Sequence, residues 1–529
     1  MAERLLGGAG RRQAARRGVS VATLPDSLRP AKADAAGARV CRGRPADDPW
    51  AVRTAYVRTS GRAPHPGDRP MHRRLATSAL ALILAAGTVH AQDGLLDPDF
   101  GLFGTGRNVI VHDQGGGNAD QSAGVLVAPD GSIYLVGTAQ TAAGSRHAIT
   151  RLTAAGIRDE SFGVGGTVYS SAADLTARRA RFDGAGNLLV AGSRAVSGTN
   201  TDFHLCRYTP QGQPLPFSAI GSACVTIPFD TQNGESADVA NDILVDPNGR
   251  IVLAGTARLS GGFSLGAIAR LRTDGTADTG FGTQGKRVYQ LGPTPVTRFN
   301  AIDHTPLGKY VAVGEFGSPD AENGTSALIA VLTTDGTPDP TFQAGAGYAG
   351  LAIDGGAPFN RDEAATGVRV QRDGSILVIG NTQIADSSVR YRLFAYKVLP
   401  AALLTLDTGF GSNGRVLIED GHSLVVDDLL VQSDGRIALI GTRRATEAFA
   451  LDMAVLRLRR DGTPDPTFGT NGRSYLDFVL PGEFDYGARI ASQAGRLIVA
   501  GHSLRASPQN YDLTVARLGN DRIFADALE

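Results

Sequence analysis

One short segment recurs seven times along the chain, and this internal repetition constrains the fold more than any other feature. Each copy is a run of apolar residues that ends in glycine, as in residues 133–137 and 251–255. The seven glycines lie 55 to 66 residues apart and are Gly137, Gly192, Gly255, Gly314, Gly380, Gly441 and Gly501. A near-constant period of this length indicates an array of similar structural units.

Other segments keep step with the apolar run. A Gly- or Asn-containing turn signal precedes it, as at residues 129–131 and 247–249, and a second β-rich run follows it. The pattern D-x-x-F-G comes next, followed by one more short strand. Each repeat therefore predicts four short strands joined by turns. Residues after 91 contain no stretch with helical periodicity.

The central strands are apolar at consecutive positions, which indicates that both of their faces are buried. Four-stranded sheets that stack radially on one another meet this condition, whereas an open β-solenoid has shorter coils. We therefore predict an all-β fold, a seven-bladed β-propeller of four-stranded antiparallel blades, over residues 92–529.

The D-x-x-F-G element supplies the most regular polar residue of the repeat. Its Asp and Phe residues are Asp97 and Phe100, Asp159 and Phe162, Asp278 and Phe281, Asp339 and Phe342, Asp407 and Phe410, and Asp465 and Phe468. A degenerate copy lies at Phe217. The Asp side chains could bind Ca²⁺ in a Gly-rich loop. We favour a structural role, in which Asp caps a turn and Phe packs between blades, and we expect no cofactor.

The combined pattern R-L-x-x-D-G-x-x-D-x-x-F-G-x-x-G, followed by D-G-x-I-x-V-x-G, resembles the delta-60 repeat of exported bacterial proteins. It is also similar to the NHL-type propeller repeat. The resemblance extends over about residues 95–521. It implies a propeller fold and an exported location, and it implies no activity.

The phase of the repeats predicts how the ring closes. The seventh repeat has only three strands, the last of them at residues 513–518, whereas an unattached strand lies at residues 107–112. Pairing these two segments covers an edge that would otherwise be exposed. We therefore expect Val109 and Ile110 to be buried against Val515 and its neighbours.

The N-terminal part differs from the repeats. Residues 1–70 are rich in Arg, Ala, Gly and Pro, and are predicted to be disordered or to reflect a start codon placed too early. Residues 71–91 combine a basic start, the apolar run 75–86 and a small-x-small site, which is typical of a signal peptide. A short buried helix is the alternative. Cleavage would leave Gln92 as the first residue of a secreted or periplasmic protein, with no membrane insertion afterwards.

The charge balance changes at the same point. Residues 1–91 hold 16 Lys or Arg against 6 Asp or Glu, whereas the remainder holds 36 against 46 and has a formal net charge of −10. An acidic protein is a poor partner for nucleic acid or for an anionic membrane surface.

Two cysteines, Cys206 and Cys224, remain after residue 91. They fall on consecutive predicted strands, and an exported chain meets an oxidising compartment, so we predict that they form a disulfide. Two buried thiols are the alternative.

No catalytic signature emerges. The histidines after residue 91 form no zinc motif, and the chain has no nucleophile elbow, no P-loop and, after Trp50, no tryptophan. We therefore favour a monomeric, non-catalytic binding or surface scaffold whose ligand is a protein or a carbohydrate. An exported hydrolase or lyase with a site at the channel mouth is the alternative. Insertions around 193–203, 315–326 and 381–392 follow the same strand, and we expect them to gather on one face.

Overall fold

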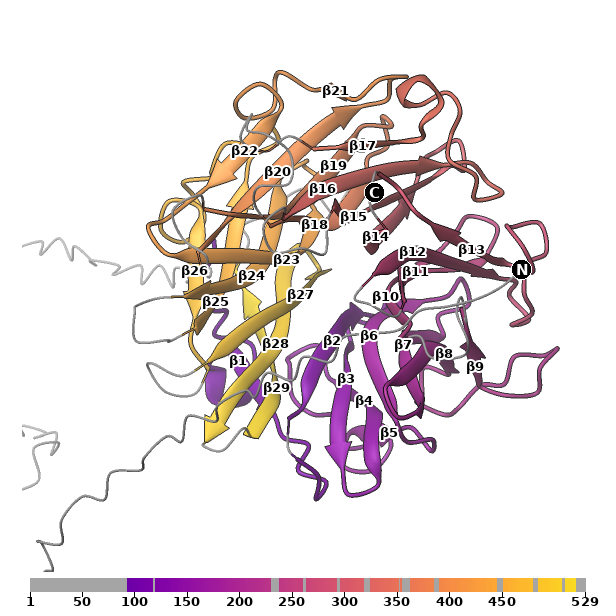
Figure 1. The fold of residues 1–529 in the computed structure, drawn as a ribbon. Helices are drawn as coiled ribbons and strands as arrows, with labels where there is room; N and C mark the ends of the chain where they lie inside the picture. The colour runs from indigo at the N-terminus through magenta and orange to yellow at the C-terminus, as the bar shows by residue number, and fades with distance from the viewer. Residues whose placement is uncertain are drawn as a thin grey trace, which may run out of the picture. The chain divides into compact units, whose positions relative to one another are not determined.

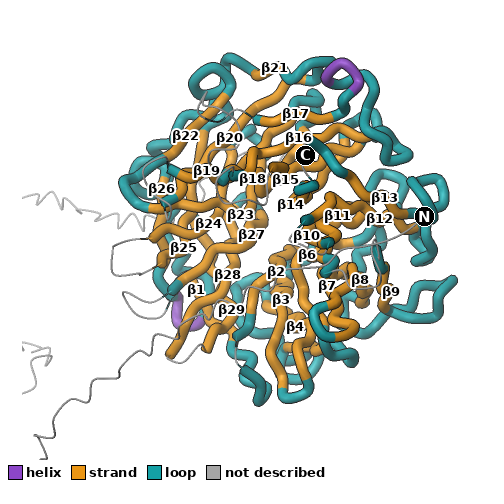
Figure 2. The backbone as a smooth tube through the Cα atoms, viewed as in Figure 1, coloured by secondary structure: helices purple, strands orange, loops and turns teal. Residues whose placement is uncertain are grey.

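Seven antiparallel sheets radiate from a common axis in the computed structural model, one sheet for each repeat (Figures 1 and 2). The structure describes residues 93–519 except for 118, 230–236, 260–262, 293–294, 318–323, 352, 354–361, 385–389, 445–450, 479–483 and 507–509. The expectations for residues 1–70, for the signal peptide 71–91 and for a start at Gln92 fall outside these residues and stay predictions.

Blades 1 to 7 are numbered in chain order, and their strands are given from the axis outward. Blade 1 contains β2 (Gln121–Val127), β3 (Ile133–Thr141), β4 (Gly144–Leu152) and β5 (Thr167–Tyr169). Blade 2 contains β6 (Leu175–Phe182), β7 (Leu188–Ser197), β8 (Asn200–Tyr208) and β9 (Cys224–Ile227). Blade 3 contains β10 (Val239–Val245), β11 (Ile251–Arg258), β12 (Ser264–Leu271) and β13 (Lys286–Tyr289).

Blade 4 contains β14 (Thr297–His304), β15 (Tyr310–Gly317), β16 (Thr325–Leu332) and β17 (Tyr348–Gly350). Blade 5 contains β18 (Glu363–Val370), β19 (Ile376–Gln383), β20 (Tyr391–Leu399), β21 (Thr405–Leu406) and β22 (Arg415–Ile418). Blade 6 contains β23 (Ser423–Val431), β24 (Ile437–Arg444), β25 (Leu451–Leu458) and β26 (Arg473–Leu476). In blade 5, both β21 and β22 pair with β20.

Blade 7 combines the two ends of the described chain. Its strands are β27 (Asp485–Gln493), β28 (Arg496–Ala506), β29 (Asn510–Leu518) and, outermost, β1 (Arg107–Ile110). Figure 1 shows β1, in indigo, beside the yellow strands β28 and β29. The N-terminal strand therefore closes the ring, as the repeat phase predicts.

The detail of this closure differs from the expectation at one residue. Ile110 pairs with Leu513, is 1% exposed and packs in the same apolar cluster as Val515. Val109 is only half-buried, because alternate residues of a strand point to opposite faces, and it packs against the cluster between blades 6 and 7.

The hydrophobic core lies between the blades. The described residues contain seven apolar clusters, and each joins two neighbouring blades. Strands such as β3 and β11 are buried at nearly every position, since each sheet has another sheet on both sides. Helical structure within the described residues is limited to 3₁₀ turns, such as η1 (Leu102–Gly104) and η3 (Gln343–Gly345). None of the described helices is long and apolar enough to span a bilayer.

The blades have two different ends. The turn face is the end with the tight turns between first and second strands, such as 128–132, and the connections between third and fourth strands, such as 153–166. The loop face is the opposite end, where second strands lead into third strands. The insertion at 193–203 belongs to the loop face, but it forms no loop, because β7 and β8 extend through it as a paired hairpin.

Candidate ligand-binding centre of the propeller

The D-x-x-F-G residues build a repeated module on the turn face. The Asp carboxylate of each copy forms an ion pair with an Arg or Lys side chain. The pairs are Arg517 with Asp97, Arg151 with Asp159, Arg270 with Asp278, Lys309 with Asp339, Lys397 with Asp407, and Arg457 with Asp465. The other carboxylate oxygen accepts a backbone N–H two residues on, as from Ser161 to Asp159. The Asp therefore caps its own turn while it pairs with the third strand or, for Asp339, with Lys309 just before the second strand.

The Phe of each module is buried against the next blade. Phe100 and Phe281 are fully buried, and the guanidinium carbons of Arg517 and Arg270 lie 4.9 Å from their ring centres. A Cβ on Gly156, in the next turn, would come within 2.3 Å of the Phe100 ring, and its φ of +76° also favours glycine. The degenerate copy keeps this packing, since Phe217 is fully buried beneath Arg207.

The Asp carboxylates of the module are the groups that would bind Ca²⁺. They are already bonded to Arg or Lys and to turn amides. They also lie in separate blades. Among the described residues, three or more His, Cys, Asp or Glu side chains converge closely enough to share an ion only at His204, Cys206 and Cys224.

The innermost strands carry a second repeated feature, a β-bulge at the same position of every blade. The bulged residues are Ala123, Arg178, Asn241, Asn300, Thr366, Asp427 and Ala488. A bulge breaks the alternation of the strand and re-aims its side chains. Polar residues therefore meet at the axis although the strands are otherwise apolar.

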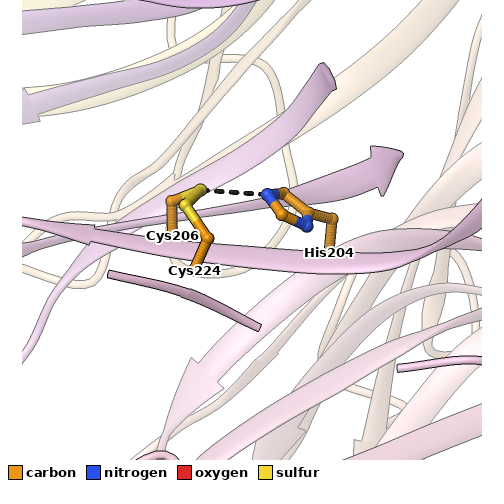
Figure 3. Close-up of side chains that lie close together, drawn as sticks. All are labelled: His204, Cys206 and Cys224. Carbon is orange, nitrogen blue, oxygen red and sulfur yellow. Dashed lines mark hydrogen bonds between the residues drawn. A yellow bond between two sulfur atoms is a disulfide. The ribbon is translucent and has the colours of Figure 1, made fainter. Parts of the chain in front are cut away.

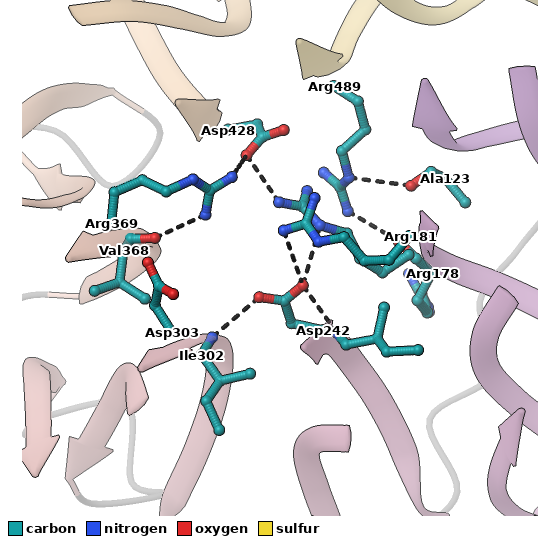
Figure 4. Close-up of polar contacts among 12 residues, drawn as sticks. Ala123, Arg178, Arg181, Asp242, Ile302, Asp303, Val368, Arg369, Asp428 and Arg489 are labelled. Atoms are coloured by element: carbon teal, nitrogen blue, oxygen red, sulfur yellow. Dashed lines mark hydrogen bonds and ion pairs between the residues drawn. The ribbon is translucent and has the colours of Figure 1, made fainter. Parts of the chain in front are cut away.

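Arg179 joins Asp242 and Asp428, which Figure 4 labels near the axis of the ring. It lies on β6, and its Nε is 3.0 Å from Asp242 of the neighbouring blade 3, while its Nη2 donates to Asp428 of blade 6 at 2.9 Å. All three side chains are buried. Arg369 of blade 5 adds a second guanidinium 3.6 Å from Asp428. This ion network occupies the axis and ties three blades to blade 2.

Arg489 bonds to backbone instead of to a carboxylate. Its guanidinium donates to the carbonyls of Ala123 and Arg178, which are bulged residues of blades 1 and 2, and of Ala488 beside it. Burial, together with the positive charge of Arg179, lowers its pKa to about 10. We call Arg179, Asp242, Arg369, Asp428 and Arg489 the axial belt.

Two adjacent carboxyls in this region have opposite shifts. Burial raises the pKa of Asp428, but the charges of Arg179 and Arg369 outweigh burial and hold it well below its usual range. Asp427, next in sequence, is half-buried, and burial raises its pKa to about 6 against the lowering effect of Arg489. The Asp427 side chain makes no hydrogen bond to the described residues. Its raised pKa brings its titration closer to neutral pH than that of an ordinary carboxyl.

Two arginines on the loop side lack carboxylate partners within the described residues. Arg178, the bulged residue of β6, and Arg258, at the end of β11, are both exposed. Burial and then the charge of Arg258 lower the pKa of Arg178, so the two guanidiniums repel each other. Arg258 also lines a cavity of about 370 Å³ together with Arg298 and Phe263.

The predicted cysteine pair lies between blades 1 and 2. Cys206 and Cys224 are direct partners across β8 and β9, with their Cα atoms 4.1 Å apart, and their sulfurs are bonded in the structure (Figure 3). His204 Nε2 is 3.0 Å from Cys206 Sγ. The redox state of this pair in the cell stays a prediction.

The sequence analysis did not single out the axial belt. A signal was present, because Arg179, Asp242, Asp428 and Arg489 interrupt strands that are otherwise apolar, as in ARRARF and VVDDLLV. What the sequence alone could not supply was the register of the bulges, which decides whether these residues meet at the axis or face solvent.

The sheet topology and the turn-face module together define a β-propeller repeat protein. Residues 186–214, 247–281, 308–342 and 432–468 match a family described as a domain of unknown function (DUF5122) beta-propeller. Three of these segments end on the Phe of the module. A comparison with curated protein sequences gives no match.

Solved structures similar to this chain are also distant from it in sequence. The polysaccharide lyase Uly1 is 9% identical, with a TM-score of 0.45, and the match covers 81% of this chain and 97% of Uly1. An endo-arabinase from Bacteroides thetaiotaomicron is 11% identical, with a TM-score of 0.29 and coverage of 52% and 92%. A protein of unknown function from Dyadobacter fermentans is 10% identical, with a TM-score of 0.39 and coverage of 79% and 100%. At these values the likeness concerns fold alone.

Proposed function

We propose that the chain is an exported, non-catalytic binding propeller of the delta-60 type that takes an anionic ligand, such as an acidic carbohydrate, on its loop face. The observation that carries this proposal is that Arg178 and Arg258 are both exposed and have no carboxylate partner among the described residues, while Arg258 lines a cavity. A bound anion would supply the missing partner.

The axial belt supports a binding role over a catalytic one. Its arginines are already bonded to Asp242, Asp428 and backbone carbonyls, so their donors are engaged without a substrate. The cavity beside Arg258 adds an apolar wall, because Leu259 and Phe263 line it. A guanidinium beside an apolar surface suits a sugar ring that carries a carboxylate.

The test is titration of the purified chain with alginate, an acidic polysaccharide, and with neutral dextran, followed by calorimetry. We expect alginate binding that weakens with salt and that falls at least tenfold in Arg178→Gln and Arg258→Gln. Arg272→Gln, an exposed arginine of the turn face, is the matched control and should bind as the wild type does. Equal binding of dextran, no binding of alginate, or an unchanged affinity in both loop-face variants would contradict the proposal.

One observation favours the enzyme alternative, namely the raised pKa of Asp427. A half-buried carboxyl with a pKa of about 6 can act as a general acid near neutral pH. Incubation with alginate distinguishes the two functions, because a hydrolase releases reducing ends and a lyase also forms unsaturated ends. Our proposal expects neither product. Turnover by the wild type that disappears in Asp427→Asn would establish the enzyme.

A further inference from the structure

The inter-blade region that holds the cysteine pair also holds two histidines, and together they have the composition of a metal site. His204 and Cys206 lie on β8, Cys224 lies on β9, and the ligand atoms of these three residues are all within 4.8 Å of one another. His204, Cys206 and Tyr208 are two residues apart on one strand, so they share the face that packs against blade 1. Cys206 and Tyr208 both belong to the apolar cluster of that interface.

His147 of blade 1 lies across from this face. Its ring centre is 5.9 Å from that of His204, and its Nδ1 is 3.5 Å from the hydroxyl of Tyr208. These two contacts place the His147 ring beside this face of β8. His147 is 0% exposed, and its Nε2 has no hydrogen-bond partner. A buried polar atom of this kind calls for an explanation.

The two imidazoles are arranged as metal ligands commonly are. The Nδ1 of His204 lies 3.3 Å from the hydroxyl of Thr226, which leaves Nε2 directed at Cys206 Sγ. A hydrogen bond at one ring nitrogen orients the other toward a metal.

We propose that, when the Cys206–Cys224 disulfide is reduced, Cys206, Cys224, His204 and His147 bind one Zn²⁺ ion or an ion of similar preference. Two thiolates and two imidazoles form a tetrahedral set typical of zinc. Ligand atoms at Zn–S and Zn–N distances of about 2.0–2.3 Å are about 3.5 Å apart in a tetrahedron. The ligand atoms of His204, Cys206 and Cys224 already lie within 4.8 Å of one another, so His147 is the ligand that has to move toward the other three. Cys224 is half-buried on the outermost strand, which provides a route of entry.

The disulfide and the metal are alternative states of one site. A dithiol reductant transfers two electrons and two protons to the disulfide, giving two thiols and the oxidised dithiol. Binding of Zn²⁺ then replaces the two thiol protons, which are released to solvent. The oxidised chain lacks both thiolates and is expected to bind no metal there.

Co²⁺ is the probe, because tetrahedral thiolate coordination gives it strong visible d–d bands and a thiolate charge-transfer band. The full chain is reduced with a phosphine, freed of reductant under anaerobic conditions and titrated. We expect about one Co²⁺ per chain in the reduced state and none in the oxidised state. Cys224→Ser and His204→Ala should lower the affinity at least tenfold, and Thr226→Val by about 10- to 100-fold. His502→Ala, which removes a half-buried histidine of blade 7, is the control and should bind as the wild type does.

Two results would overturn the proposal. One is reduced wild type that binds no more Co²⁺ than the oxidised chain; the other is unaltered bands in both Cys224→Ser and His204→Ala. Thermal unfolding accompanies each titration, since reduction or substitution can weaken the blade interface. We expect Zn²⁺ to raise the melting temperature of the reduced chain and to leave that of the oxidised chain unchanged. A reduced chain that Zn²⁺ fails to stabilise would also count against the site.

Discussion

Carboxylates on the turn face and on the loop face of the same blades have opposite electrostatic environments. On the turn face, hydroxyl, ammonium and guanidinium donors lower the pKa, as Ser161 does for Asp159 and Lys397 does for Asp407. On the loop face, burial dominates. It raises the pKa of Asp120 to about 7 and that of Asp485 to about 6, and neighbouring carboxyls add to the effect.

The positions of these residues explain the difference. Turn-face carboxylates sit in short turns whose amides and Ser or Thr hydroxyls are close by in sequence, so each repeat supplies its own donors. Asp120 and Asp485 begin innermost strands, where the neighbouring blade brings further carboxyls such as Asp512 and Asp452. The turn-face carboxylates therefore have donors from their own repeat, whereas Asp120 and Asp485 on the loop face lie where their charged form is disfavoured. Asp420, also on the loop face, is an exception, because burial is outweighed by Arg443 and Tyr475, which lower its pKa.

The largest effect is expected from removing the N-terminal copy of the turn-face module. Deletion of residues 93–113 exposes the edge of β29 and leaves Arg517 without Asp97. A buried pair that loses one partner costs about 3–5 kcal/mol, and loss of buried Phe100 costs about 3–5 kcal/mol more. The sum is comparable with the whole stability of a typical domain, about 5–15 kcal/mol.

Chemical denaturation should therefore show an unfolded or molten chain for this deletion. The double variant Leu95→Ala with Phe103→Ala is the control, because both side chains are exposed, at 49% and 99%. A deletion that unfolds at the wild-type denaturant concentration would show that the segment is a dispensable tail.

Arg179→Met tests the axial belt, which lies between the two faces. The substitution leaves Asp242 and Asp428 buried without their shared cation, and we expect a loss of about 3–5 kcal/mol in unfolding free energy at pH 7.5. Because Arg179 holds the pKa of Asp428 low, this contribution is present above the unfolded pKa of about 3.9 and is lost as the pH falls through the folded value.

The deficit of Arg179→Met relative to wild type should accordingly shrink at pH 4, where the orphaned carboxyls take up protons. Arg459→Met, an exposed arginine, is the control and should cost little at either pH. A deficit that does not vary between pH 7.5 and pH 4 would mean that Arg179 acts by packing and not by charge.

Asp120→Asn tests the loop face. The asparagine oxygen can still accept the backbone N–H of Gln140, which Asp120 accepts at 2.8 Å. The folded pKa of Asp120 lies above its unfolded value, so in the wild type its ionisation lowers stability as the pH rises from about 4 through 7. We expect the variant to gain stability relative to wild type by about 2–4 kcal/mol between pH 5 and pH 8. If the difference in unfolding free energy between Asp120→Asn and the wild type did not vary with pH, the proposed contrast between the two faces would be wrong.

Asp159→Asn gives the smallest change and the opposite sign. Its lowered pKa means that its contribution is present above about pH 4 and is lost as the pH falls through the folded value. The side chains of Arg151 and Asp159 are 19% and 25% exposed, so we expect a loss of up to about 1 kcal/mol at pH 7 that disappears in acid. Parallel denaturation of the two asparagine variants across pH 4–8 measures the asymmetry directly.

The number of blades, their four strands and the closure by β1 followed from the sequence because each rests on repetition. A period near sixty residues and a leftover strand at residues 107–112 are visible without coordinates. The Asp and Phe of the module were also recognisable, because the D-x-x-F-G pattern recurs in the repeats.

The axial belt and the His147 contact could not be predicted in this way. Arg179 and Asp428 are 249 residues apart, and His147 meets His204 across a blade interface. Such contacts depend on the exact register at which seven sheets pack, which local patterns do not encode. The hairpin at 193–203 was mistaken for a loop for a related reason, since pairing between β7 and β8 extends through residues of low apolar content.

Closure by β1 has a consequence for how the protein acquires its structure. The strand that completes blade 7 emerges first from the ribosome, and its partner β29 is among the last strands made. The Asp97–Arg517 pair joins residues 420 positions apart, so it cannot form until almost the whole chain is present. The entropy cost of closing a loop grows only slowly with its length, but the waiting time is set by synthesis of the chain. Until then the edge of the last blade stays open to proteases and to other chains, and completion of the ring marks the moment at which the protein becomes resistant to both.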